Sequence, residues 1–273
     1  MISVRPPAVA GLFYPATAAA LRREVAALLD GAGTAAQARP VPKAIVAPHA
    51  GYIYSGAVAA AAYARLLPAR ETITRVVLLG PVHRVPIRGL AVPAASLMST
   101  PLGNVMVDAQ ALAALSLLPQ VARNEAAHAQ EHSLEVHLPF LQSVLARFSV
   151  VPLVVGDASA EEVAQVLDAL WGGPETLIVV SSDLSHYLDY REAQATDRVT
   201  AQAILDLRAD ISHEQACGGT PLNGLALAAR RHHLAPDLID LRNSGDAAGD
   251  RRRVVGYGAF AFCAPPGGDT GVH

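Results

Sequence analysis

The segment Thr176-Leu-Ile-Val-Val180 is a short run of β-branched and apolar residues, with helical patterns before it (160–170) and after it (191–207). An uninterrupted run of this kind is typical of a strand that is buried on both faces of a sheet. Similar runs occur at 44–47, 75–80 and 150–155. The pattern predicts an α/β fold with a central, largely parallel or mixed sheet and helices on both of its faces.

The remaining patterns fit the same architecture. Further helices are expected from the loop after residue 47 to about 67, and at 134–147 and 222–232, and further strands at 238–241 and 254–262. No Pro-, Gly- or Ser-rich linker divides the chain, and no repeat of fixed period is visible. We therefore expect a single domain over residues 1–264 and a flexible tail over 265–273.

Composition excludes several classes of protein. The 273 residues are 52% hydrophobic and 16% charged, which excludes global disorder. The net charge of −3 argues against nucleic-acid binding as the main role. The longest apolar stretch, residues 56–63, is too short to span a membrane, and the first residues lack the apolar centre of a signal peptide. We therefore predict a cytoplasmic protein with no nucleic-acid or membrane partner.

Reactive side chains follow three of the predicted strands. His49 follows the first strand, His83 follows the second, and Asp183 and His186 follow the run that ends at Val180. Ligands of open α/β sheets bind beyond the carboxyl ends of the strands. Imidazoles buried there without polar partners would be costly, so we expect these side chains to share a pocket.

Cys217 is a further candidate, because it lies just before the helix predicted from about Leu222. The positive end of a helix dipole favours the thiolate, so this position predicts a cysteine that ionises easily. The thiolate either binds a metal or attacks carbon, and the sequence leaves both roles open.

The segment 131–137 combines two glutamates and two histidines, but not in the His-Glu-x-x-His order of zinc peptidases. If the segment is helical, His132 and Glu135 share one face while His137 points elsewhere. We favour a supporting or helix-starting role for this segment over direct metal binding. His128, nearby in a polar context, is expected to be solvated.

These motifs occur in one order along almost the whole chain, and together they resemble the Memo-like family, known in bacteria and archaea as the B component of the AmmeMemoRadiSam system. One departure is Val82, where many relatives carry a smaller residue, and it leaves His83 in place. The matching stretches are Arg5 to Pro15, Ala47 to Gly56, Gly80 to His83, Glu131 to Phe140, Ser181 to Tyr187, Cys217 to Pro221 and Val255 to Gly258.

The resemblance implies a fold similar to the class III extradiol dioxygenases, which hold Fe(II) with two histidines and a glutamate. By motif, His49 and His83 would be the imidazole ligands, and Cys217 would replace the carboxylate. Asp183 and His186 would be catalytic residues in the same pocket, with His186 as the acid/base. The implied cofactor is Fe(II) or copper. The implied partners are an unknown small molecule and, through the gene system, a radical SAM protein.

Four functions are compatible with these residues. The first is a mononuclear redox-metal site with dioxygenase-like oxidoreductase activity. The second is a non-catalytic ligand- or peptide-binding module that keeps the pocket. The third is metal-dependent hydrolysis with Asp183 or Glu135 as base, and the fourth uses Cys217 as a nucleophile. The groove of the binding module would be lined by the aromatic residues Phe13, Tyr14, Tyr52, Tyr54 and Tyr187. We favour the alternative that these side chains simply pack around the strand ends.

Overall fold

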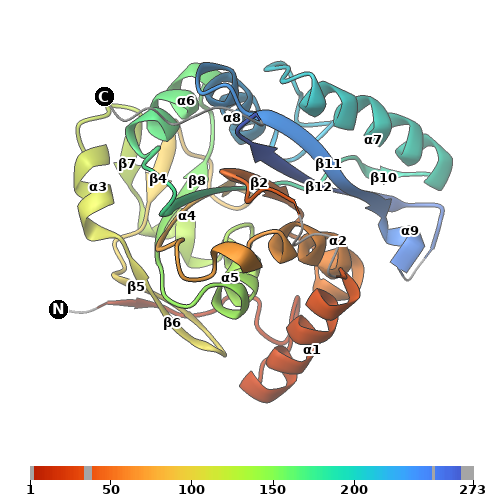
Figure 1. Ribbon diagram of the computed structural model, residues 1–273, viewed down its shortest axis with the longest axis horizontal. Coiled ribbons are helices and arrows are strands. Elements are labelled where there is room, and N and C mark those ends of the chain that lie inside the picture. Colours follow the sequence, from red (N-terminus) through yellow and green to blue (C-terminus); the bar gives the residue numbers. More distant parts are fainter. Residues whose placement is uncertain (1–2, 34–38, 248–249, 266–273) are drawn as a thin grey trace.

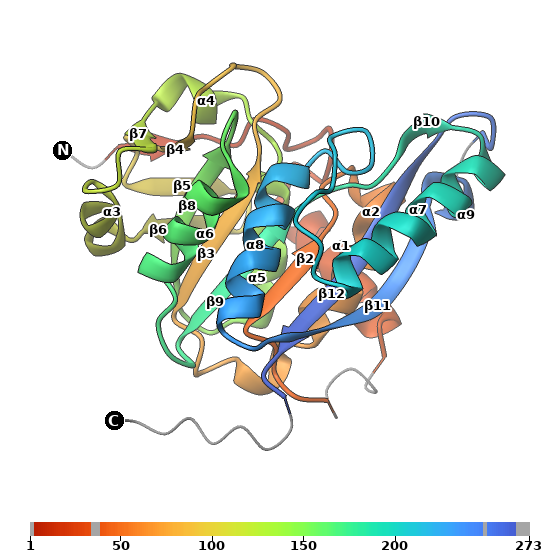
Figure 2. The ribbon, with the colours of Figure 1, turned by 90° about the horizontal axis from the view of Figure 1, so that it is seen from above.

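Helices cover both faces of one mixed sheet in the computed structural model of the chain, which describes residues 3–33, 39–247 and 250–265 (Figures 1 and 2). The predicted α/β fold class is therefore confirmed. The tail predicted from residue 265 lies, from 266 on, outside the described residues. Within the described part, no helix is long and apolar enough to cross a membrane.

The sheet runs in the order β1-β5-β6-β8-β3-β9-β2-β12-β10, with β11 paired to β12 and β4 paired to β7 and β8. Its four central strands, β8, β3, β9 and β2, are parallel, and β12 joins β2 antiparallel. The strand bounds are β1 Val4–Arg5, β2 Ala44–Ala47, β3 Arg75–Pro81, β4 Leu90–Val92, β5 Leu97–Thr100, β6 Gly103–Val107, β7 Val121–Arg123, β8 Ser149–Val155, β9 Thr176–Ser181, β10 His186–Leu188, β11 Ala235–Asn243 and β12 Val254–Cys263.

Alternation along the central strands creates two hydrophobic layers. In β9, Leu177 and Val179 face one layer, while Ile178 and Val180 face the other. The first layer packs against α1, α2 and α5, and the second against α6 and α8, with α7 over β11 and β12 (Figure 2). The helix bounds are α1 Ala18–Gly31, α2 Tyr52–Ala64, η2 Leu67–Ala69, α3 Ala109–Leu115, α4 Glu125–Ala129, η3 Glu135–His137, α5 Leu138–Val144, α6 Ala160–Ala169, α7 Tyr190–Leu205, α8 Gly219–Arg231 and α9 Ser244–Ala247.

The segment 134–147 differs from the helix expected there. Residues 131–134 are irregular, a 3-10 turn follows at Glu135–His137, and the α-helix begins only at Leu138, with Pro139 in its first turn. Proline fits the first turn of a helix, where its missing N–H is not needed. The helical-face argument for His132 therefore does not apply.

Candidate metal centre

Three neighbouring parallel strands deliver the candidate residues to one edge of the sheet. His49 lies two residues beyond β2, His83 lies two residues beyond β3, and Ser181 ends β9, which runs between these two strands. Because these strands are parallel, their carboxyl ends meet at the same edge, as the sequence predicts.

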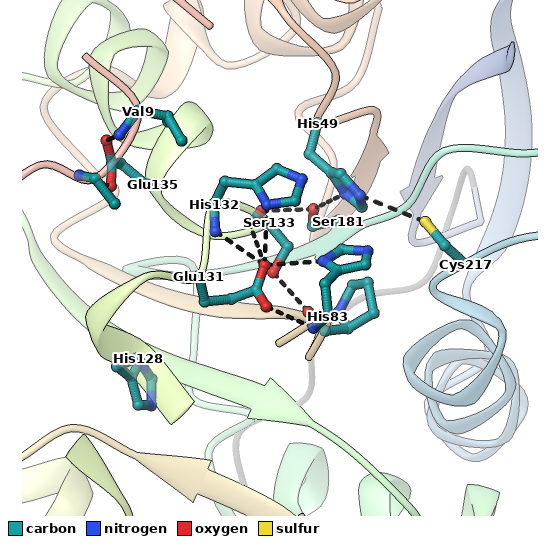
Figure 3. A network of polar contacts seen from close by, with 12 residues as sticks. Val9, His49, His83, His128, Glu131, His132, Ser133, Glu135, Ser181 and Cys217 are labelled. Atoms are coloured by element: carbon teal, nitrogen blue, oxygen red, sulfur yellow. Dashed lines mark hydrogen bonds and ion pairs between the residues drawn. The ribbon is translucent and has the colours of Figure 1, made fainter. Parts of the chain in front are cut away.

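Three imidazoles come together at this edge. One ring nitrogen from each of His49, His83 and His132 lies within 4.8 Å of the other two. Figure 3 shows the three rings around a common point, with the Glu131 carboxylate beside His83 and the Cys217 sulfur beyond His49. The structure thus places His132 in a group that could bind a metal, rather than in the supporting role favoured from the sequence.

The tautomer of His49 is set by a short hydrogen-bond chain. The Ser181 hydroxyl donates its proton to the carbonyl of Ser133 (2.7 Å), so it accepts a hydrogen bond from His49 Nδ1 (2.6 Å). Nε2 then carries the lone pair, which faces the Cys217 sulfur 3.4 Å away. Burial, followed by the neighbouring histidines, holds the pKa of His49 well below its usual value, so the ring is neutral at pH 7.

Glu131 sets the tautomer of His83 in the same way, by accepting a hydrogen bond from its Nδ1. Its carboxylate accepts hydrogen bonds from His83 Nδ1 (2.9 Å), and from the backbone N–H groups of His83 (2.6 Å), His132 (2.9 Å) and Ser133 (3.0 Å). Burial would raise the pKa of Glu131, but these bonds and the charge of His83 lower it to about 2. A carboxylate behind a histidine is the usual outer partner of a metal ligand, and it leaves Nε2 of His83 free.

His132 lacks such a partner. Its buried Nδ1 lies 3.3 Å from Glu131 Oε1 but makes no hydrogen bond. Burial lowers the pKa of His132 to about 4, against the charge of Glu131, so this ring is also neutral at pH 7. Three imidazoles, one with an unpartnered buried nitrogen, fit a transition-metal ion, and the low pKa values of His49 and His132 mean that these two rings need no deprotonation to bind it.

Cys217 approaches the cluster from the start of α8. Its Sγ lies 3.4 Å from Nε2 of His49 and 3.7 Å from the carbonyl oxygen of Asp183. The easy ionisation expected from the helix N-terminus is wrong: burial and the charge of Asp183 raise the pKa of Cys217 to about 12. The side chain is therefore a thiol unless a cation displaces its proton. Its role as a metal ligand stays a prediction.

Asp183 and His186 follow the end of β9. Asp183 Oδ1 accepts the backbone N–H of His49 (2.8 Å), and burial raises its pKa to about 7, against that bond. His186 begins β10, where burial and, less strongly, the charge of His83 lower its pKa. A bulge follows, and Tyr187 takes a left-handed conformation with φ 61°. The catalytic roles of Asp183 and His186 stay predictions.

Two glycines allow these loops to approach the strand ends. A Cβ at Gly80 would lie 2.9 Å from Ser133 Oγ and from Leu134 Cδ2. A Cβ at Gly218 would lie 2.6 Å from the carbonyl oxygen of Ser181. The absence of a side chain at both positions lets the 131–134 segment and the start of α8 close over the sheet.

The sequence misplaces one residue near the cluster. His128 is buried, with Nε2 2.9 Å from the carbonyl oxygen of Ala91, so the expected solvation is wrong. Tyr14 and Tyr52 are buried in the core, as the preferred packing interpretation predicts, whereas Tyr54 and Tyr187 are exposed. The sequence assigns Glu131 no definite role. Its position directly before His132 is the one local signal, and nothing in the sequence indicates that its carboxylate contacts His83.

A separate cavity of about 460 Å³ lies between α1, α2 and β11. It shares no residue with the three-histidine cluster. Apolar side chains such as Leu28 and Ile239 line it together with the ion-paired Arg39, Arg65 and Asp237.

Comparisons with known proteins identify the family of the chain. Residues 5–261 match the family model described as "Memo-like protein". The chain is 36% identical to a "MEMO1 family protein" of Aquifex aeolicus, over 95% of this chain and 99% of that protein. It is also 36% identical to one of Methanococcoides burtonii, over 94% and 99%. An uncharacterized protein of Escherichia coli K12, solved by crystallography, has a TM-score of 0.49 at 13% identity, over 81% of this chain and 100% of that chain.

The family match spans most of the chain and includes every residue of the three-histidine cluster, together with Glu131 and Cys217. The resemblance seen in the sequence motifs is therefore confirmed: this chain belongs to the Memo-like protein family.

Proposed function

We propose that the chain holds one redox-active metal ion, iron or copper, at His49, His83 and Cys217, with His132 as a further ligand. The supporting observation is the convergence of three imidazole nitrogens within 4.8 Å of one another. Imidazole with a thiol nearby suits copper, iron or zinc rather than magnesium or calcium. The protein would act as a metal-dependent oxidoreductase, similar to a dioxygenase, on a small molecule.

A bound iron or copper ion would supply electron transfer and Lewis acidity to this edge of the sheet. The chain's own groups set the conditions. Ser181 and Glu131 keep the Nε2 lone pairs of His49 and His83 available. Asp183 fixes the backbone of His49, and the half-buried His186 would hold or move a proton of the substrate.

Metal analysis of protein purified without oxygen tests the proposal. We expect about one equivalent of iron or copper per chain, lost in His49→Ala and His83→Ala and reduced in Cys217→Ser. His232→Ala is the matched control, because His232 pairs with Asp168 elsewhere on the fold. Full metal content in the first two variants would rule out this site.

Oxygen consumption by the metal-loaded, reduced protein separates the enzyme from the non-catalytic module. An oxidoreductase consumes oxygen with a suitable small-molecule substrate, and His186→Gln slows the reaction without removing the metal. A loaded protein that binds ligands but shows no turnover with any candidate substrate would favour the module.

A further inference from the structure

We infer that the N-terminal segment 5–14 is a structural part of the metal centre, in which Phe13 is a positioning residue for the His132 ring. The link to metal binding rests on the function proposed above. The segment lies far from the three histidines in sequence, but its contacts join two of the loops that carry them.

Glu135 anchors the segment. Its fully buried carboxylate accepts hydrogen bonds from Arg5 (2.5 Å), the backbone N–H groups of Ala8 (2.7 Å) and Val9 (3.0 Å), and the Tyr14 hydroxyl (2.6 Å). Four donors from one ten-residue stretch meet a single charged acceptor. Such charge-assisted bonds are stronger than neutral ones, so they fix the segment firmly.

Arg5 ties the same segment to the histidine loop. Its Nε donates to the carbonyl oxygen of His128 (2.9 Å), and a terminal nitrogen donates to that of Glu131 (2.5 Å). With Glu135 as its third partner, the buried guanidinium holds both ends of the irregular stretch that carries His132. The position of this stretch therefore depends on the N-terminal segment.

Phe13 makes the contact with the metal-binding group. Its ring centroid lies 4.9 Å from that of His132, with the planes tilted by 60°. Its carbonyl oxygen accepts the N–H of Tyr52 (2.8 Å), the first residue of α2 and three residues after His49. One residue thus contacts both the His132 ring and the loop of His49.

Packing is what orients His132. The rings of His49 and His83 are each held by a hydrogen bond at Nδ1, to Ser181 and Glu131. The Nδ1 atom of His132 has no such bond, and its ring packs against those of Phe13, His49 and His83. Phe13 therefore orients the His132 ring by packing against it, whereas hydrogen bonds orient the rings of His49 and His83.

The test compares Phe13→Ala with Phe13→Tyr, which keeps the ring, and with Leu12→Ala, whose side chain is 79% exposed. Side-chain NMR of ¹⁵N-histidine-labelled, metal-free protein reads the His132 ring directly, with His132→Asn for assignment. We expect Phe13→Ala to move the His132 signals, while Phe13→Tyr and Leu12→Ala leave them near their wild-type positions. Thermal unfolding shows that each variant is folded.

Copper(II) titration of the same proteins gives the second measurement. Loss of an outer partner typically weakens metal binding about 10- to 100-fold, and we expect this for Phe13→Ala with an altered EPR spectrum. Unchanged His132 signals in folded Phe13→Ala would overturn the positioning role. A wild-type chain that binds no metal would instead remove the proposed function, whatever the NMR shows.

Discussion

The carboxylate of Glu131 holds several parts of the site in place. Four N–H groups converge on it, from the ring of His83 and the backbones of His83, His132 and Ser133. A neutral amide cannot satisfy them all, because its NH₂ group would face a donor. We therefore expect Glu131→Gln to leave the ring of His83 poorly fixed.

The predicted effect of Glu131→Gln is a metal affinity about 10- to 100-fold weaker, as for other outer-partner losses. Competition titration with a chelator measures it. Glu71→Gln is the control, since the Glu71 side chain is 80% exposed and lies before β3, at the opposite end of that strand from His83. Equal affinities in the two variants would show that the carboxylate does not support metal binding.

His128 predicts a pH effect on stability. Burial, opposed by its bond to Ala91, lowers its pKa from 6.5 to about 4, so below pH 6.5 the unfolded chain takes up a proton that the folded chain refuses. This contribution is complete above pH 6.5 and is lost as the pH falls toward 4. The loss approaches about 1.4 kcal/mol per pH unit for such a group.

We predict that His128→Gln loses less stability than wild type between pH 6.5 and 4.5, as measured by urea unfolding. Taking the difference from wild type cancels other titrating groups, including Asp183, whose raised pKa acts in the opposite direction. His233→Asn, at an exposed position, serves as the control. Parallel curves for His128→Gln and wild type would refute the assignment.

Only some of the site residues can be predicted from the sequence. His49 and His83 are recognisable because each follows a strand whose pattern is plain, and parallel strands end at one edge. His132 is harder to place, since its direction depends on an irregular segment rather than on a helical period. The pKa of Cys217 also escapes a local rule, because burial outweighs the helix terminus.

At the scale of elements, the placement of α8 depends on its first turn. Gly218 is its N-cap, and a Cβ there would overlap Ser181 and Ser182 at 2.6 Å. We predict that Gly218→Ala destabilises the protein by about 1–3 kcal/mol, as overpacking typically does, and displaces Cys217. Chemical denaturation and the rate of Cys217 alkylation by a thiol reagent measure the two effects.

Gly31→Ala is the matched control, because a Cβ at the end of α1 meets nothing within 4 Å. It should be neutral or stabilise by a few tenths of a kcal/mol to about 1 kcal/mol, through helix propensity. Stability loss of the same size in both variants would refute the packing argument for α8.

Strong periodicity explains which elements are predictable. β2, β3, β8 and β9 are buried apolar runs, and their observed bounds lie within one residue of the sequence-based ones. The region from β4 to α4 has short elements, of which β6 and β7 are largely exposed and β4 pairs with the more distant β7 and β8, and its pattern predicts none of them. α1 carries a usable signal, the Thr17 N-cap, but it is easily passed over.

At the scale of the whole molecule, metal binding and folding are coupled. The three histidines come from separate strand ends and a loop, so the unfolded chain offers no formed site. We predict that free copper at 100 times its Kd raises the free energy of unfolding by about 2.7 kcal/mol. Calorimetry with and without metal checks this, and His49→Ala/His83→Ala should show no such gain.

The ion pair between Arg5 and Glu135 cannot form early in the synthesis of the chain. The two residues are 130 positions apart, so at about 5–20 residues per second Arg5 is added to the chain roughly 6 to 26 seconds before its partner. β12, which lies between β2 and the edge strands, is made later still. During translation the Arg5 guanidinium therefore stays hydrated until the segment that carries Glu135 has been made.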